Sequence, residues 1–284
     1  MGLSRPGLWA LLLASAVPAA AVPQGHGPAY GLSTPTLGKG RWSVDLAAMR
    51  RVVGTAKSLM LRPMVSHGLT EDLQVSVSVP VLLDVAPGLP GARGMARMPT
   101  TPDVEVLGAW RFQRRATGVG ARLESTLYLG VDYPTDAVRA GARTAPGFVG
   151  AAVTGYASRT VYAWIGGLYR RYLTVGDGMP DHLGDVWMYT AVVGYRPRPF
   201  QHDYPAPDWR VFVEAVGEYS TKTTIGGNVQ PDRGGHQVFV GPTLLGLYGS
   251  WGISGGPVFP VHRRPNGSQP RETLRFIVNV THWF

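Results

Sequence analysis

Hydrophobic and polar residues alternate with a period of two in several separate segments of the chain. In Arg122–Tyr133, one set of alternate positions reads Leu123, Ser125, Leu127, Leu129, Val131 and Tyr133, and the other reads Arg122, Glu124, Thr126, Tyr128, Gly130 and Asp132. Successive side chains of a β-strand point to opposite faces, so the pattern predicts a strand with an apolar and a polar face. Similar alternation occurs near residues 73–81, 103–112, 209–218 and 274–284. We therefore expect an all-β protein.

The alternation predicts about twelve strands, separated by connections rich in Gly, Pro and Arg. They lie near residues 42–53, 59–67, 73–84, 103–114, 121–133, 147–157, 160–172, 185–196, 208–220, 236–248, 251–262 and 272–284. Short connections such as Gly68–Asp72 alternate with long ones such as Val85–Pro102. Such an alternation is typical of outer-membrane barrels. The long segment Pro197–Pro207 departs from this order, because it falls where a short turn is expected.

The composition excludes several other classes of protein. The 284 residues include 38 Gly and 24 Pro, which disfavour a helical bundle. Hydrophobic residues make up 44% of the chain, enough to form a core, so the composition argues against disorder. The absence of Cys excludes disulfide scaffolds, thiol catalysis and cysteine metal sites.

The first residues predict export. Arg5, the apolar stretch Leu8–Val17 and the small residues Ala19–Ala21 match a secretory signal peptide over residues 1–21. Residues 22–40 are expected to form a periplasmic N-terminal segment. The uncharged stretch Val238–Val261 is too rich in Gly and Pro for a spanning helix. An antiparallel transmembrane β-barrel over residues 41–284, with both termini periplasmic, is the structure that remains, because it also satisfies its backbone groups internally.

Three segments resemble known outer-membrane proteins. The C-terminal Phe276–Phe284 resembles the terminal-strand signal of bacterial outer-membrane proteins. The resemblance implies that Phe276, Val278, Val280 and Phe284 form a membrane-insertion signal read by the barrel-assembly machinery. His282 departs from that signal, which usually has an aromatic residue there.

The segments Tyr30–Val44 and Gly68–Leu73 resemble the transporter-like outer-membrane barrels named for the meta-pathway of phenol degradation. This second resemblance covers nearly the whole predicted mature chain as short motifs. It implies location in the outer membrane of a Gram-negative-type cell and passage of small, often aromatic, solutes.

Motifs with catalytic chemistry are weak. Gly252–Gly256 matches the G-x-S-x-G pattern of hydrolases, but Pro257 and the residues after it predict more strand, whereas the nucleophile needs a strand-to-helix turn. The seven His residues do not have metal-site spacing. We expect no catalytic residue, no metal and no cofactor.

The chain is basic, with 27 Lys and Arg against 18 Asp and Glu, and only three of the basic residues are Lys. The basic residues form no long run, so nucleic-acid binding is not indicated. Arginine binds phosphate groups bidentately, so lipopolysaccharide phosphates are the expected partners of arginines in the predicted outer loops. These arginines are Arg93, Arg97, Arg139, Arg143, Arg233, Arg263, Arg264 and Arg271.

A second set of charged residues is expected to face the lumen. It comprises Asp103, Glu105, Arg111, Arg122, Glu124, Asp132, Arg210, Glu214, Glu218 and Arg275. Two interpretations stay open: ion pairs that hold a narrow lumen together, or charges that select solutes. The aromatic residues Tyr128, Tyr162, Trp164, Trp187 and Tyr189 are expected either inside the lumen or in the girdles at the membrane interfaces.

Three functions therefore follow in order. The first is an outer-membrane channel that passes small solutes passively. The second is a closed structural or interaction barrel that presents its loops. A membrane-embedded lipid hydrolase is the third, and it lacks a Ser and a His that the sequence places together.

Overall fold

The computed structural model describes residues 27–85, 103–133, 144–174, 182–202 and 205–284 of the chain. The predicted signal peptide, residues 1–21, lies outside the described residues.

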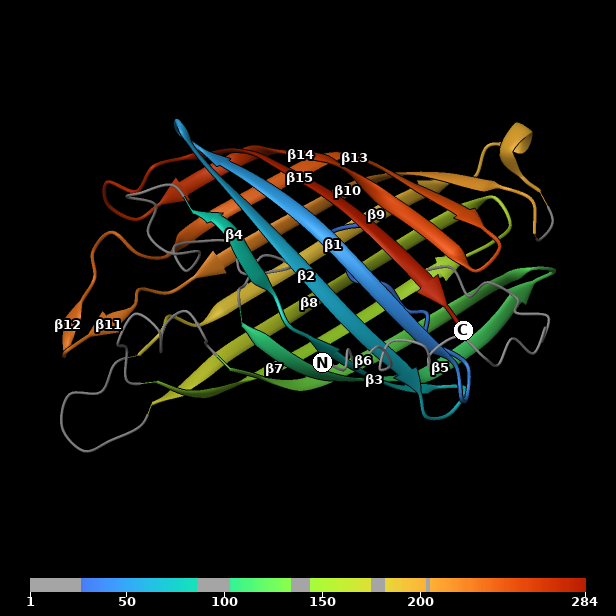
Figure 1. Cartoon of the computed structure of the whole chain (residues 1–284), viewed down its shortest axis with the longest axis horizontal. Helices are drawn as coiled ribbons and strands as arrows, with labels where there is room; N and C mark the ends of the chain where they lie inside the picture. The colour runs from blue at the N-terminus through green and yellow to red at the C-terminus, as the bar shows by residue number, and fades with distance from the viewer. Residues whose placement is uncertain (1–26, 86–102, 134–143, 175–181, 203–204) are drawn as a thin grey trace, which may run out of the picture.

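The strands form one antiparallel sheet that closes into a barrel (Figure 1). They are β1 (Trp42–Val53), β2 (Ala56–Gly68), β3 (Leu73–Ser78), β4 (Val81–Val85), β5 (Val104–Gly118), β6 (Ala121–Tyr133), β7 (Thr144–Ala157), β8 (Val161–Thr174), β9 (Val186–Tyr195), β10 (Asp208–Ser220), β13 (Gly235–Tyr248), β14 (Trp251–Pro265) and β15 (Glu272–Trp283). Pairing of β1 with β15 completes the ring. The strands β11 (Thr224–Ile225) and β12 (Asn228–Val229) form a separate small hairpin.

The predicted barrel of twelve strands is confirmed, with one difference. β3 and β4 both pair with β2, so together they occupy one position in the ring, and the thirteen described strands of the sheet fill twelve positions. The expected single strand over residues 73–84 is wrong at Val79 and Pro80, which separate the two pieces. Proline has no N–H to donate, so a continuous ladder is interrupted there.

The barrel has two different ends. One end, called the terminus end here, carries the C-terminus and the short turns that join β2 to β3, β5 to β6, β7 to β8 and β13 to β14. The long connection between β9 and β10, which contains the short 3₁₀ turn Arg198–Phe200 (η1), lies at this end too. The opposite end, called the loop end, carries most of the long connections. None of the described helices is long and apolar enough to cross a membrane.

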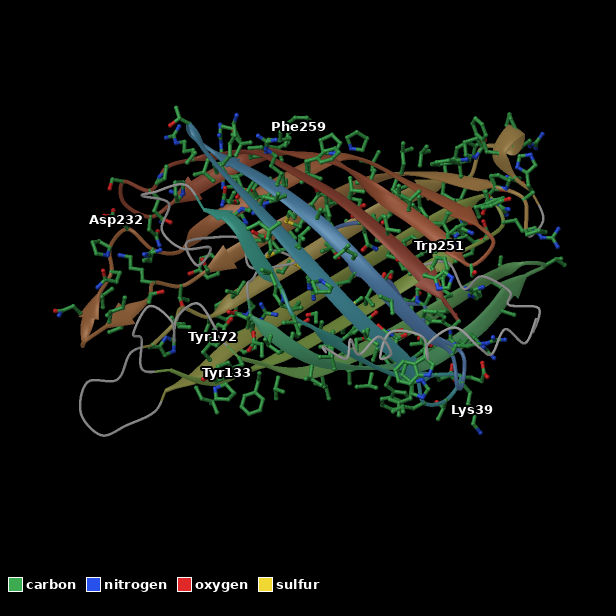
Figure 2. All side chains as sticks on the ribbon, viewed as in Figure 1. Lys39, Tyr133, Tyr172, Asp232, Trp251 and Phe259 are labelled. Carbon is green, nitrogen blue, oxygen red and sulfur yellow. The ribbon has the colours of Figure 1, made fainter. Side chains whose placement is uncertain are left out.

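The outer face of the wall is apolar. Exposed side chains such as Leu129 and Ile165, with 61% and 63% of their surface exposed, alternate with buried inward ones. Figure 2 shows Tyr133 and Phe259 on this outer face. An apolar exterior around a polar interior is the arrangement of a barrel that faces lipid.

Candidate functional site: the barrel lumen

Residues 27–37, called the plug here, run through the inside of the barrel. Thr34 has no exposed surface, and Tyr30 and Leu37 are 4% and 3% exposed. Tyr30 joins the core cluster formed by inward side chains of the wall. The described part of the N-terminal segment expected over residues 22–40 thus lies inside the barrel, where the lumen buries its apolar and hydrogen-bonding groups.

One buried carboxylate anchors the plug. Glu214 of β10 accepts the backbone N–H groups of Ala29, Tyr30 and Gly31 at 2.8, 2.8 and 2.7 Å. It also accepts the hydroxyl of Thr243 from the neighbouring strand β13. No described basic residue forms an ion pair with Glu214. The plug backbone therefore takes the place of a basic partner, and hydrogen bonds to an ionised carboxylate are stronger than neutral ones.

Further hydrogen bonds fix the plug to other strands of the wall, including one from the Tyr30 hydroxyl to the Gly256 carbonyl of β14 at 2.9 Å. The Thr34 hydroxyl donates to Glu124 of β6 at 3.2 Å and accepts from the Trp164 indole of β8 at 3.1 Å. The Tyr128 hydroxyl donates to the Ser33 carbonyl, and the Leu37 N–H donates to Gln74 of β3. All of these contacts are non-covalent.

A cavity of about 250 Å³ lies between the plug and part of the wall. Its apolar lining includes Met49, Met60, Met64, Leu107 and Ile277. Its polar lining includes Asp45, Arg62, Gln74, Ser76, Ser78, Glu105 and Asn279. The wall residues of this lining belong to strands β1, β2, β3, β5, β6, β14 and β15.

Two networks of buried ion pairs occupy the half of the lumen toward the loop end. In the first, Glu105 of β5 lies opposite Asp132 of β6, and Arg170 of β8 contacts both carboxylates, with 2.6 Å to Asp132. Arg62 reaches Glu105 from the other side at 3.1 Å. Two like charges placed opposite each other are destabilising, so Arg170 is what allows them to be buried together.

The second network centres on Arg275 of β15. Its guanidinium donates to Glu218 at 2.7 and 2.9 Å and to Glu272 at 2.7 and 3.1 Å. Arg51 of β1 adds a second partner for Glu272 at 2.8 Å. The Arg275 guanidinium also lies 3.8 Å from the centre of the Phe239 ring. Both networks join wall strands to each other and leave the plug out.

The ten residues predicted to face the lumen all lie on its inner face. Eight of them are buried, and Arg210 and Arg122 are more exposed, with 16% and 49% of their side-chain surface open near the terminus end. Arg111 and Arg122 pair with Glu124 at 3.2 and 2.9 Å, within the hairpin of β5 and β6. These charges are therefore mostly paired.

Sequence reasoning missed several lumen residues, namely Asp45, Arg51, Arg62, Arg170, Glu272 and the whole plug. Arg170 could have been found, because it alternates in step with the inward Leu168 and Tyr172 of β8. The sequence did not decide whether five aromatic residues face the lumen or the membrane interfaces. In the structure, Tyr128, Tyr162 and Trp164 face inward, whereas Trp187 and Tyr189 face outward.

The other candidate residues lie as follows. Gly252–Gly256 is part of strand β14, as the strand interpretation predicts, so Ser254 is not on a strand-to-helix turn. Across the described ranges, no group of three or more His, Asp or Glu could hold a metal ion. The terminal residues Phe276, Val280 and Phe284 are exposed on the outer face, and Val278 lies on the same face of β15.

The predicted loop arginines fall into three groups. Arg263 and Arg264 were expected in a loop but lie in β14, which extends to Pro265. Arg233 and Arg271 lie in connections. Arg93, Arg97, Arg139 and Arg143 lie outside the described residues.

Comparison with known proteins agrees with this geometry. No protein-family model matches the sequence, and no curated protein matches it either. Among solved structures, the COG4313 outer membrane channel from Pseudomonas putida F1 superposes with a TM-score of 0.61 at 14% identity, covering 92% of this chain and 100% of that one. The NanC porin superposes with a TM-score of 0.51 at 10% identity, covering 84% and 98%. The chain therefore has the fold of an outer-membrane β-barrel.

Proposed function

We propose that the protein is a passive channel for small solutes in the outer membrane. The observation that carries the proposal is the plug. It occupies part of the lumen next to a cavity, and only non-covalent contacts hold it there. The two similar structures are a channel and a porin, which supports the same class of function.

Passage of a solute requires the plug to move. The hydrogen bonds from Ala29, Tyr30 and Gly31 to Glu214 can be replaced by bonds to water, since an opened lumen is wet. The buried networks around Arg170 and Arg275 join wall strands only, so they keep the barrel closed on itself when the plug leaves. The wall and the plug are thus separable parts of one structure.

The cavity supports a solute with an apolar body. Three thioethers, those of Met49, Met60 and Met64, lie in its lining, and methionine adapts its shape to different guests. A cavity of about 150 Å³ holds a benzene molecule, so 250 Å³ admits a small aromatic compound. This agrees with the resemblance to the barrels named for the meta-pathway of phenol degradation, and we propose small aromatic compounds as solutes.

Single-channel conductance in a planar bilayer tests the proposal. We expect a small or intermittent conductance for the wild-type protein and a larger, steadier one when residues 27–37 are deleted. Glu214→Gln should increase the open time, because an amide accepts fewer hydrogen bonds than a carboxylate. The matched control deletes residues 226–229, whose hairpin lies outside the barrel sheet, and should conduct like the wild type.

Two alternatives make different predictions. A closed structural barrel, which the buried ion-pair networks favour, gives no conductance in the wild type or in either plug variant. A lipid hydrolase needs a Ser, a His and a carboxylate together. Ser250 lies 3.4 Å from Nε2 of His282, but no carboxylate in the described ranges contacts that His. The geometry therefore does not favour hydrolysis.

A further inference from the structure

A row of aromatic residues crosses the outer wall near the loop end. The strand register places Tyr169, Trp187, Tyr219, His236 and Arg264 side by side on β8, β9, β10, β13 and β14. The ring centres of Trp187 lie 4.9 Å from Tyr169 and 5.7 Å from Tyr219. Aromatic girdles of this kind mark the level of the membrane–water interface. The row ends with His236 and Arg264, and this end is therefore expected at the level of the lipid headgroups.

That end holds three basic side chains, His236, His262 and Arg264, which we call the basic patch. On β14, His262 and Arg264 lie opposite the outward Val238 and His236, so both face outward, and a β-bulge follows where the register shifts between Val238 and Phe239. The imidazole centres of His236 and His262 lie 5.0 Å apart. The Tyr189 hydroxyl lies 2.9 Å from Nε2 of His236 and holds that ring in place.

Within the described residues, the basic patch lies on the outer face without an acidic partner. The outward positions of β9, β10, β13 and β14 contain no Asp or Glu, since Glu214, Glu218 and Glu272 of this region point inward. Arg264 forms no ion pair within the described part of the chain. A cation on the lipid-facing wall is costly near the membrane midplane and is tolerated at the interface. An anionic lipid headgroup at the interface can supply its counter-ion.

We propose that the basic patch binds the phosphate of an anionic lipid headgroup at the loop end of the barrel. The Arg264 guanidinium matches a phosphate bidentately, and the two imidazoles add N–H donors beside it. Of the arginines expected in loops, the site takes only Arg264, which lies on the strand wall in β14, and it adds two histidines that the sequence did not indicate. The proposal does not depend on whether solutes pass through the lumen.

Native mass spectrometry of the full-length mature protein tests this site. The protein is placed in phosphatidylcholine nanodiscs that contain lipid A, and the retained lipid is weighed. The wild type should retain lipid A in preference to phosphatidylcholine. A variant with His236→Gln, His262→Gln and Arg264→Gln should retain at least about fivefold less lipid A, since one arginine near the membrane surface contributes about that factor.

Arg50→Gln is the matched control. Arg50 is also an exposed cation on the outer wall, on β1, but it lies opposite Leu59 and Phe276 rather than beside other basic residues. It should leave lipid A retention unchanged. Equal retention by the wild type and the triple variant would overturn the proposal, as would an equal loss in the Arg50 variant. Wild-type protein that retains phosphatidylcholine as readily as lipid A contradicts it without any variant.

Discussion

At the scale of single residues, Arg170 shows how much one inward side chain contributes to the stability of the barrel. It has no exposed surface and contacts Glu105 and Asp132, which lie opposite each other. Arg170→Met leaves these carboxylates facing each other without it, and breaking a buried pair costs about 3–5 kcal/mol. We expect that loss in the free energy of unfolding, measured by urea titration in lipid vesicles.

Arg122→Met is the control at the same scale. Arg122 also pairs with a buried carboxylate, but 49% of its side chain is exposed near the terminus end. Solvent-exposed pairs contribute about 0–1 kcal/mol, so this variant should unfold close to the wild type. Similar losses of unfolding free energy in the two variants would contradict the prediction that the buried Arg170 pairs stabilise the barrel more than the exposed Arg122 pair.

At the scale of the element, each strand separates a lipid face from a lumen face. On β6, Leu127 faces outward near the middle of the strand, while Thr126 faces the lumen with no exposed surface. Leu127→Arg should cost about 2–4 kcal/mol of folding free energy, because the charge enters the centre of the bilayer. The fraction of protein that becomes heat-modifiable on a gel measures this cost.

Leu123→Arg tests how the cost of a charge depends on its depth in the membrane, on the same face of the same strand. Leu123 lies two residues from the first residue of β6, close to the terminus end. Near the interface the cost of the charge falls to about 0–1 kcal/mol. If both variants fold equally well, the outer face of β6 does not lie against lipid at the depth inferred here.

At the scale of the whole molecule, closure depends on the last strand. The Phe284 N–H donates to the Trp42 carbonyl at 3.0 Å, and the Trp42 N–H donates back at 3.4 Å, at the end of the seam between β1 and β15. Deleting Phe284 removes this pair and the final residue of the predicted insertion signal. We expect a much lower yield in the outer-membrane fraction.

Deletion of Gly226 and Gly227 is the control for that change. These residues lie in the β11–β12 hairpin, outside the barrel sheet, and exposed connections tolerate change. Its yield should match the wild type. Equal yields for the two deletions would mean that Phe284 carries no special role in assembly.

The sequence by itself determined the strands and their faces. Alternation is local, since each residue reports its own side of the sheet, so the predicted strand over residues 208–220 matches β10 from end to end. It also placed all ten predicted charged residues on the inner face. The expected strand over residues 73–84 is interrupted at Pro80. The sequence shows that this residue has no N–H, but whether its absence interrupts the strand depends on whether the neighbouring strand offers a carbonyl to that position.

Only the tertiary structure decided which inward residues meet. The closed ring brings Arg170 to Glu105 across 65 residues of sequence, and alternation carries no information about such partners. The plug was hidden for a related reason. Residues 27–37 have no regular period of their own, and their place in the lumen follows from Glu214, Glu124 and Gln74, which three distant strands supply. Local pattern sets the direction of a side chain, whereas register and closure set its neighbours.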